Sequence, residues 1–272
     1  MGSQVTMSKT ALITGASSGI GLELARCCAH DGHRVVLVAR SVEKLDALAE
    51  QLREAHGCEA VVMPADLAEP DAPQRLADEL AERGIEVDWL MNNAGFGIAG
   101  RFAKGEVGRQ RDLRRVNMES PMLLTHLLGG AMLERGAGRV LNVASIAGFL
   151  PGPLMANYYA SKAYLVSFSL AVNEEWRRRG VSVSVLCPGP TETAFFANAA
   201  ARTAPIAGGA GTGGLKSAAA VARTGYRGML KGKPIIVPGL TNKLTVFATR
   251  LLPRTVAARM AKKFNRTKPG EG

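Results

Sequence analysis

The sequence predicts a doubly wound α/β domain, in which a parallel β-sheet carries helices on both faces. Short β-rich apolar runs alternate along the chain with longer segments of helical periodicity, and this alternation is typical of βαβ units. Residues 181–187 are apolar at nearly every second position and are bracketed by Gly180 and Pro188, as expected of a strand buried between two helix layers. Together the runs predict a seven-stranded sheet in a three-layer α/β/α arrangement.

The expected elements follow one another in regular order over a chain of 272 residues, which is long enough for one large domain. Strands are expected at residues 10–14, 34–39, 59–64, 88–92, 138–144, 181–187 and 234–238. Helices are expected at residues 19–30, 42–56, 71–83, 108–135, 156–179 and 217–230.

One segment interrupts this order. Residues 190–216 are rich in Ala, Gly and Thr and contain Phe195 and Phe196. A long irregular segment inside a compact domain is usually functional or mobile. We interpret residues 190–216 as a flap over a pocket; a plain surface loop anchored by its aromatic side chains is the alternative.

The junction between the first strand and the first helix carries the most informative motif. Residues 14–21 read Thr-Gly-Ala-Ser-Ser-Gly-Ile-Gly. Glycine allows close approach of another molecule to the backbone, and the N-terminus of a helix favours a phosphate. Doubly wound sheets bind pyrophosphate at this junction, so we expect a dinucleotide site, with a purely structural turn as the alternative. The candidate cofactor-binding residues here are Gly15, Ser17, Ser18, Gly19, Ile20 and Gly21.

The ends of the next strands refine the choice of dinucleotide. Arg40 and Ser41 end the second strand, where an acidic residue would bind the ribose hydroxyls and repel a 2′-phosphate. Guanidinium pairs well with phosphate, which predicts NADP(H) in preference to NAD(H); an ordinary surface arginine is the alternative. Asp66 is positioned to contact the adenine amino group, and the small residues of the segment 92–95 would let the backbone lie against the cofactor. The candidates in that segment are Asn93, Ala94 and Gly95.

Tyr158 and Lys162 are the candidates for proton transfer. They are four residues apart on an expected helix, so their side chains share one face. A tyrosine with a reference pKa of about 10 is a poor acid–base catalyst at neutral pH, and a nearby ammonium lowers that pKa. The neighbouring Tyr159 has Ala163 at the same offset and lacks such a partner.

Two polar residues accompany this pair. Ser145 ends the fifth strand, at the edge where open α/β sheets bind ligands, and could hydrogen-bond the same substrate oxygen as Tyr158. Asn117 lies within a long helical segment although asparagine is a poor helix former. Asn117 either faces solvent or breaks the helix locally and binds a water that relays protons to Lys162.

With these motifs, in this order and spacing, the chain resembles the short-chain dehydrogenases/reductases, which are single-domain Rossmann oxidoreductases. The resemblance covers roughly residues 8–240 and includes Pro188 to Thr193. It implies a tetrad of Asn117, Ser145, Tyr158 and Lys162. Ser145 would polarise a carbonyl, Tyr158 would be the general acid in reduction, Lys162 would hold the nicotinamide ribose and lower the Tyr158 pKa, and Asn117 would hold the relay water.

The resemblance also implies the remaining cofactor contacts and an oligomeric state. Thr193 and the backbone near Gly189 would contact the nicotinamide carboxamide, and the ending Ala39-Arg40-Ser41 resembles the NADP-preferring members. Members often form dimers or tetramers through the helices that correspond to residues 108–135 and 156–179, so a homodimer or homotetramer is expected here. The full set of cofactor-binding candidates adds Leu67, Tyr158, Lys162, Pro188, Gly189 and Thr191.

The net positive charge of the chain comes entirely from its last fifty residues. Residues 1–222 carry equal numbers of basic and acidic residues, whereas residues 223–272 carry 12 Lys and Arg and one acid, Glu271. We separate a domain at 1–240 from a basic amphipathic extension at 241–272, which could contact an anionic membrane, pack on a partner subunit, cover the pocket or pack on the body of the chain. Nucleic-acid binding is disfavoured because the extension lacks interleaved stacking aromatics.

No apolar run approaches the roughly 20 residues of a membrane-spanning helix, and no secretory h-region is recognised at the N-terminus. The four cysteines have no metal-binding spacing and are expected to be reduced packing residues. No metal site is expected, and the expected location is the cytoplasm, with peripheral membrane contact as an extension of it.

We therefore expect an NADP(H)-dependent oxidoreductase that transfers a hydride between nicotinamide and a ketone, aldehyde or secondary alcohol. An apolar pocket would favour lipophilic substrates. A non-catalytic NADP-binding sensor or scaffold, and a membrane-surface reductase of a lipid-borne substrate, are the alternatives. The expected pocket lining is Phe96, Phe149, Leu150, Met155 and Phe195.

Overall fold

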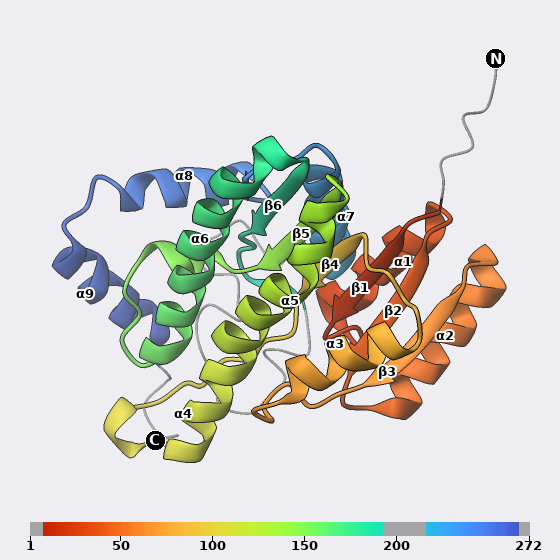
Figure 1. Cartoon of the computed structure of the whole chain (residues 1–272). Coiled ribbons are helices and arrows are strands. Elements are labelled where there is room, and N and C mark those ends of the chain that lie inside the picture. Colours follow the sequence, from red (N-terminus) through yellow and green to blue (C-terminus); the bar gives the residue numbers. More distant parts are fainter. Residues whose placement is uncertain (1–7, 193–215, 267–272) are drawn as a thin grey trace.

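Seven parallel strands form one twisted sheet in a computed structural model that describes residues 8–192 and 216–266 (Figure 1). Within these residues the strand order is β3-β2-β1-β4-β5-β6-β9. A separate parallel pair, β7 with β8, joins the two ends of the expected flap, whose residues 193–215 lie outside the described part. The strands are β1 (Thr10–Thr14), β2 (Arg34–Ala39), β3 (Ala60–Pro64), β4 (Trp89–Asn92), β5 (Gly138–Val143), β6 (Val181–Leu186), β7 (Thr191–Glu192), β8 (Lys216–Ser217) and β9 (Ile235–Ile236).

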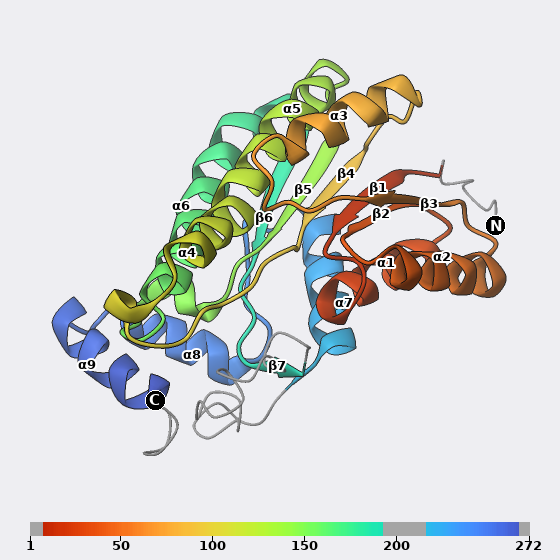
Figure 2. The ribbon, with the colours of Figure 1, turned by 90° about the horizontal axis from the view of Figure 1, so that it is seen from below.

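The helices cover both faces of this sheet, as Figure 2 shows. α1, α2 and α7 lie against one face, and α3, α5 and α6 lie against the other. The fold is therefore the three-layer, doubly wound arrangement that the sequence predicts. The α-helices are α1 (Gly19–His30), α2 (Val42–His56), α3 (Ala72–Glu82), α4 (Val107–Arg114), α5 (Ser120–Glu134), α6 (Ala156–Trp176), α7 (Ala218–Leu230), α8 (Leu240–Thr249) and α9 (Arg254–Asn265).

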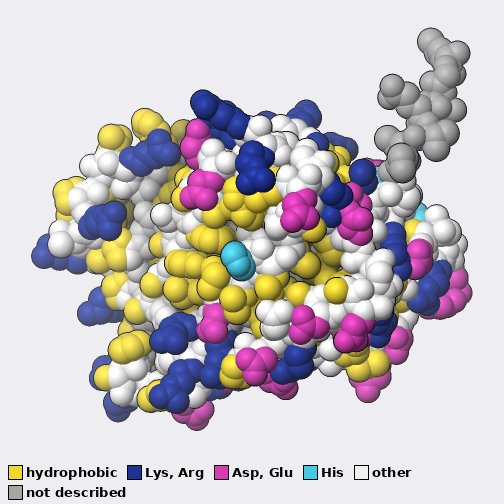
Figure 3. Space-filling view, in the orientation of Figure 1, with side chains coloured by type: hydrophobic (Ala, Val, Ile, Leu, Met, Phe, Trp, Pro, Cys, Tyr) yellow, Lys and Arg dark blue, Asp and Glu magenta, His cyan; other side chains and the backbone are white. Residues whose placement is uncertain are grey.

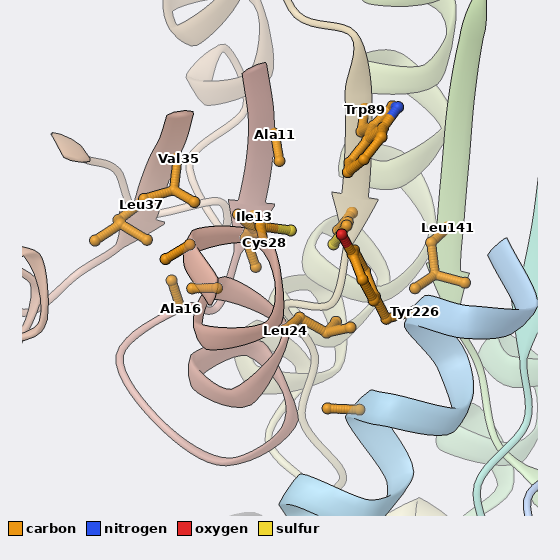
Figure 4. Close-up of a cluster of buried hydrophobic side chains, with 14 of the residues drawn as sticks. Ala11, Ile13, Ala16, Leu24, Cys28, Val35, Leu37, Trp89, Leu141 and Tyr226 are labelled. Atoms are coloured by element: carbon orange, nitrogen blue, oxygen red, sulfur yellow. The ribbon is translucent and has the colours of Figure 1, made fainter. Parts of the chain in front are cut away.

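Successive residues of the central strands supply the two halves of the core, because strand side chains alternate between faces. Ala11 and Ile13 of β1 are fully buried against α1, together with Leu24 (Figure 4). Leu12, between them in sequence, points to the other face and packs in the cluster that includes Leu124 of α5. Strands buried on both faces explain why these segments are almost continuously apolar.

The strand order reverses between β1 and β4, and this reversal locates the site. On one side of β1 the chain proceeds to β2 and β3, and on the other it proceeds to β4, β5 and β6. The connections after β1 and β4 therefore leave the sheet in opposite directions and open a crevice at its carboxyl edge. Thr14 and Asn92, the last residues of the two strands, border this point.

The expected single helix over residues 108–135 is not found. Instead α4 is followed by a π-helical turn over Arg115–Glu119, labelled η2, and then by α5. Asn117 lies in this turn with no exposed surface, and its side-chain amide hydrogen-bonds the backbone of Phe96. The helix is widened at the residue whose side chain is drawn towards the 93–96 loop, as π-bulges at functional sites commonly are.

Other boundaries differ by smaller amounts. The expected helix 156–179 ends as an α-helix at Trp176 and continues as a 3₁₀ turn, η4 (Arg177–Arg179). The last strand is reduced to two residues, Ile235 and Ile236, because β9 is an edge strand with a short pairing to β6. Two further 3₁₀ turns are η1 (Phe102–Lys104) and η3 (Ile146–Phe149).

The C-terminal helices α8 and α9 lie together at one end of the molecule, away from α1 and α2 (Figures 1 and 2). α9 is attached to α6 and to the segment before it by its last residue: the Tyr159 hydroxyl donates to Asn265 Oδ1 at 3.1 Å, and Asn265 Nδ2 donates to the Pro153 carbonyl at 3.0 Å. These bonds show that the extension is packed against the body of the domain.

No helix among the described residues is both long and apolar enough to cross a bilayer.

The four cysteines are unpaired and serve as packing residues, as expected. Cys28, Cys58 and Cys187 are buried and Cys27 is half-buried. Burial raises the pKa of each thiol, to about 11 for Cys27 and about 12 for Cys187. A raised pKa keeps the thiol protonated and unreactive at neutral pH.

Candidate active site

One cavity of about 1170 Å³ runs along the carboxyl edge of the sheet. It exceeds the roughly 300–1000 Å³ of a pocket for one drug-sized ligand, so it has room for a dinucleotide and a second molecule. Gly21 and Asn117 do not line it, and Thr193 lies outside the described residues. The predicted residues that do line it are Gly15, Ser17, Ser18, Gly19, Ile20, Arg40, Ser41, Asp66, Leu67, Asn93, Ala94, Gly95, Ser145, Tyr158, Lys162, Pro188, Gly189 and Thr191.

The glycine turn forms one end of the cavity, where a pyrophosphate would fit. Gly15 has φ +66°, and the Asn93 side-chain amide donates to the carbonyls of Thr14 and Gly15 at 3.0 and 3.3 Å. α1 begins at Gly19, and its N-cap Ser18 makes no side-chain hydrogen bond to the helix. The first-turn N–H groups of α1 therefore receive no cap from this serine, which suits an anion at the helix N-terminus.

Gly21 serves the packing of this turn and does not face the cavity. A Cβ on Gly21 would lie 2.3 Å from the carbonyl oxygen of Gly15 and 2.4 Å from Nδ2 of Asn93. Only a residue without a side chain lets α1 approach the turn so closely. The pattern of three glycines thus combines a cavity wall with a helix contact, and sequence alone does not separate the two roles.

A cationic rim adjoins the glycine turn. Arg40 Nη1 lies 4.0 Å from Asp66 Oδ2, and the Arg40 side chain is 77% exposed. Lys44, in the first turn of α2, also lines the cavity. Sequence reasoning missed Lys44, although a second basic residue four positions after Arg40 was a readable signal. Two cations at this rim suit a phosphate better than a bare ribose hydroxyl.

Ser145, Tyr158 and Lys162 come together at the other end of the cavity. Ser145 lies two residues after the end of β5 and caps the turn η3, where its Oγ accepts the N–H of Ala147 at 3.1 Å. Tyr158 and Lys162 share one face of α6, and Lys162 Nζ lies 5.8 Å from the centroid of the Tyr158 ring. The carboxyl end of a buried strand and one helix face therefore deliver the hydroxyl, the phenol and the ammonium to one place.

The pKa of Tyr158 differs from the expected direction. Burial raises the pKa of this phenol above its usual value, a hydrogen bond with Ser145 lowers it in part, and the neighbouring Tyr159 raises it again. Desolvation outweighs the stabilising contacts because the phenolate would have to form away from water. Tyr158 is thus a protonated phenol at neutral pH, which is the form of a proton donor.

Lys162 shows the complementary effect. Burial lowers the pKa of its ammonium to about 8, and its Nζ donates to the Val143 carbonyl at 2.9 Å. A buried cation at this position is a strongly perturbed titratable group in a cavity, which is a recognised feature of catalytic sites.

Asn117 stands behind the cavity wall. Its Oδ1 accepts the N–H of Phe96, and its Nδ2 donates to the Phe96 carbonyl and to Ser161 Oγ, each at 3.0 Å. Of the two expected alternatives, exposure to solvent is wrong and local disruption of the helix is right. Its role in holding a relay water stays a prediction.

Apolar side chains that the sequence predicts for the pocket also line the cavity in part. Phe96, Leu150 and Met155 line it as expected. Phe149 does not, because it packs instead with the cluster around Leu165, and Phe195 lies outside the described residues. Sequence reasoning also missed the lining residues that come from the C-terminal helices and the segment between them: Thr245, Ala248, Thr249, Leu252, Ala257, Met260, Ala261 and Phe264.

Comparison with known proteins agrees with this geometry. The sequence model of the short chain dehydrogenase family matches residues 9–204. A solved short-chain dehydrogenase from Sphingobium yanoikuyae in complex with NADPH superposes with a TM-score of 0.79 at 29% identity, over 89% of this chain and 93% of that one.

Two curated relatives match over a similar stretch. Ketoacyl reductase HetN from Nostoc sp. is 36% identical over 181 residues, which are 66% of this chain and 63% of the relative. The 17-beta-hydroxysteroid dehydrogenase type 3 of Rattus norvegicus is 33% identical over 190 residues, 69% of this chain and 61% of the relative. The chain thus spans less than two thirds of the length of these two proteins.

Proposed function

The chain belongs to the short-chain dehydrogenase family of oxidoreductases, and from this premise we propose that it is an NADP(H)-dependent carbonyl reductase or alcohol dehydrogenase. The observation that carries the proposal is the convergence of Ser145, Tyr158 and Lys162 on one end of a cavity whose other end is the glycine turn. A bound nicotinamide would supply or accept the hydride at the substrate carbon. The residues of the chain would handle the oxygen and its proton.

In the reductive direction, the hydroxyls of Ser145 and Tyr158 would hydrogen-bond the carbonyl oxygen. Tyr158 would then donate its proton to that oxygen as general acid. Because burial raises the pKa of Tyr158, the phenol holds this proton until the oxygen becomes basic. The Lys162 ammonium, 5.8 Å from the ring centroid, would stabilise the phenolate left behind.

The preference for NADP(H) is supported by charge and by similarity. Arg40 and Lys44 border the cavity next to the end of β2, where a 2′-phosphate would lie. The Sphingobium yanoikuyae structure contains NADPH. The partial pairing of Arg40 with Asp66 at 4.0 Å leaves the guanidinium accessible, because its side chain is mostly exposed.

A lipophilic substrate is supported by the apolar walls at the Tyr158 end. Phe96, Leu150 and Met155 supply one side of these walls, and Met260 and Phe264 of α9 supply another. The names of the two relatives refer to a ketoacyl group and a hydroxysteroid, and a steroid is a bulky, mainly apolar molecule. We include in the proposal a bulky ketone or secondary alcohol as the substrate class.

The proposal extends to assembly and location. Hydrophobic side chains gather on the face over α5 and α6 (Figure 3), which supports a homodimer or homotetramer formed through these helices. The excess of Lys and Arg in residues 223–272 supports contact with the surface of a membrane from the cytoplasmic side. A non-catalytic sensor is disfavoured because such a protein has no use for the paired Tyr158 and Lys162.

The adjacent tyrosines provide a matched test. Tyr158→Phe removes the acidic proton with little change of shape, so we expect turnover to fall by roughly 10²-fold or more while cofactor binding survives. Tyr159→Phe removes only a hydroxyl bonded to Asn265 and should retain turnover within several-fold. The assay follows absorbance at 340 nm with NADPH and NADH side by side, across ketones of graded size.

Near-normal turnover of Tyr158→Phe would contradict the assignment of the general acid. An unchanged rate when NADH replaces NADPH would contradict the cofactor preference. Oxidation of NADPH by small polar ketones alone would contradict the lipophilic substrate class.

A further inference from the structure

A row of uncovered apolar side chains follows the outer side of α8. Leu240, Leu244 and Phe247 recur at intervals of four and three residues, which places them on one side of α8, and Leu251 follows two residues after the helix ends at Thr249. The side chains of these four residues are 59–73% exposed. Large apolar side chains exposed singly are ordinary, but three on one helix face with a fourth just beyond its end mark an interaction site. We call these four residues the α8 row.

The other sides of α8 either pack against the domain or line the cavity. Asn242 and Val246 are buried against the body of the domain, whereas Thr245 and Thr249 line the cavity. α8 is therefore a wall between the cavity and the outside, fixed in place on one side and apolar on the other. The α8 row is the part of this wall that no described residue covers.

Two further exposed apolar side chains, on α9, belong to the cavity wall. Met260 and Phe264 of α9 line the cavity and are also 48% and 45% exposed. α9 is held by its buried Ala257 and Ala261 and by the hydrogen bonds of Asn265. An apolar molecule that enters the cavity beside α9 would therefore contact Met260 and Phe264.

The charges around the α8 row have one sign. The sequence contains no Asp or Glu between residues 193 and 270. The exposed cations on and between the two helices are Lys243, Arg250, Arg254, Arg259, Lys262, Lys263 and Arg266. In Figure 3 dark-blue Lys and Arg side chains stand beside yellow hydrophobic ones at the end of the molecule where Figure 1 shows α8 and α9. Apolar side chains bordered by Lys and Arg are the composition of helices that lie in the interface of anionic membranes.

A second copy of the chain fits this surface poorly. A two-fold interface places a surface patch against itself, so these cations would face one another. The face over α5 and α6 is better suited to a second copy, because the sequence from Ser120 to Leu133 contains no Asp, Glu, Lys or Arg. The two apolar faces therefore differ in charge and suit different partners.

We propose that the α8 row docks on an anionic lipid bilayer, so that the cavity mouth beside Met260 and Phe264 opens towards the lipid. The substrate is then an amphiphilic ketone or secondary alcohol dissolved in the bilayer, which enters the cavity past Met260 and Phe264. This inference rests on the proposed function for the nature of the reaction, but the docking itself does not depend on it.

Vesicle binding tests the docking surface. The full chain is sedimented with vesicles of phosphatidylglycerol and phosphatidylcholine, and separately with vesicles of phosphatidylcholine alone. Wild type should bind the anionic vesicles more tightly. Phe247→Ser/Leu251→Ser should raise the apparent Kd at least about tenfold, because two large apolar side chains lose their burial in lipid.

A second pair of exposed apolar residues supplies the matched control. Phe102→Ser/Val107→Ser changes side chains that are 67% and 66% exposed in and after η1, and it should leave vesicle binding unchanged. Failure of wild type to bind anionic vesicles, or an equal loss of binding in both double variants, would overturn the proposal. So would a change of oligomeric mass in Phe247→Ser/Leu251→Ser without a change in vesicle binding, which would identify a contact between copies.

Activity measurements separate the docking from the chemistry. Neither Phe247 nor Leu251 lines the cavity, so their double variant should reduce a water-soluble ketone as wild type does. It should lose at least about tenfold in rate on a long-chain ketone carried in anionic vesicles, in line with its weaker binding. Equal rates of both proteins on the vesicle-borne ketone would overturn the substrate route. Absence of NADPH-dependent activity with every ketone would instead reject the proposed function and leave the vesicle result interpretable.

Discussion

Lys162 is the residue at which stability and chemistry oppose each other most directly. Its side chain is 4% exposed, and burial lowers the pKa of its ammonium from 10.5 to about 8. A difference of this size corresponds to about 3 kcal/mol, and it destabilises the folded chain whenever the ammonium is charged. The hydrogen bond to the Val143 carbonyl offsets about 1 kcal/mol of that cost. The ligand-free protein thus keeps a cation that its fold alone would not favour.

We therefore predict that Lys162→Met stabilises the ligand-free protein at pH 7, by about 1–2 kcal/mol after the loss of the bond to Val143, while it removes activity. Between about pH 8 and 10.5 the folded wild type releases the proton before the unfolded chain does. The free energy of unfolding of wild type therefore rises over this range, and the advantage of the variant should disappear by pH 10. Urea unfolding of both proteins at pH 7 and pH 10 measures this. A stability difference that is the same at both pH values would contradict the assignment of the burial cost to the ammonium.

The two tyrosines show what a sequence can and cannot reveal at this scale. The four-residue spacing to Lys162 distinguishes Tyr158 from Tyr159 without a structure. The partner of Tyr159 is Asn265, 106 positions away, and no local pattern connects them. The pKa of Tyr158 was expected in the wrong direction for a similar reason, because its burial depends on the whole cavity wall and not on its helix neighbours.

Among the elements, the boundaries of α1 and α2 agree with those expected from periodicity and glycine positions. A local break of the helix at Asn117 was one of the two expected alternatives, but the π-helical form of the turn η2 was not expected. Asparagine at position 117 indicates a weak place in a helix, but the cause of the turn is the hydrogen bonding of its amide to Phe96, 21 residues earlier. Local propensity predicts where an element is vulnerable, and tertiary contacts decide what form it takes.

The hydrogen bonds between Asn117 and Phe96 predict that Asn117→Ala lowers the stability of the fold. The substitution leaves the N–H and the carbonyl of Phe96 without their side-chain partner, at about 1–3 kcal/mol for each buried group. For a total of about 2–6 kcal/mol, we expect the melting temperature to fall by about 4–24 °C, at roughly 2–4 °C for each kcal/mol. Differential scanning calorimetry measures the change. Asn157→Ala, which removes a half-buried amide bonded to Gln110, is the control and should lower the melting temperature far less. Equal effects of the two substitutions would argue against a special role of η2.

At the scale of the whole molecule, the distribution of apolar surface predicts how copies assemble. The outward side of α5 carries His126 and the half-buried Leu123 and Leu127 without a charged neighbour on that helix before Glu134. Figure 3 shows the same face as a broad hydrophobic area. Contiguous apolar surface of this kind is typical of an interface between subunits.

We predict that Leu127→Glu lowers the oligomeric mass of the protein, because burial of an unpaired carboxylate in an apolar interface is strongly unfavourable. Size-exclusion chromatography with light scattering measures the mass. Val42→Glu on α2, where an exposed valine lies at the far end of the sheet, is the control and should not change it. A monomeric wild type, or an unchanged mass for Leu127→Glu, would reject α5 as the interface.

The whole-molecule arrangement was only partly predictable. The sheet, its two helix layers and the location of the cavity follow from strand order and glycine position, which are local signals with known consequences. The residues of the cavity wall formed by α8, α9 and the segment between them were not predicted. Leu252 and Phe264 line it, yet their sequence pattern fits a helix on a membrane, on another subunit or on the domain itself equally well.

The C-terminal helices line the cavity and are joined to the body of the domain through both polar atoms of the Asn265 side chain, so they cannot be removed without opening the site. A deletion at residue 240 would strip away the basic surface, but it would also leave the Tyr159 hydroxyl and the Pro153 carbonyl unsatisfied and expose the interior of the chamber to water. Any loss of function after such a shortening would be ambiguous in origin. Attempts to broaden or retarget the range of compounds accepted should therefore work by single replacements along α9, keeping its anchoring asparagine intact.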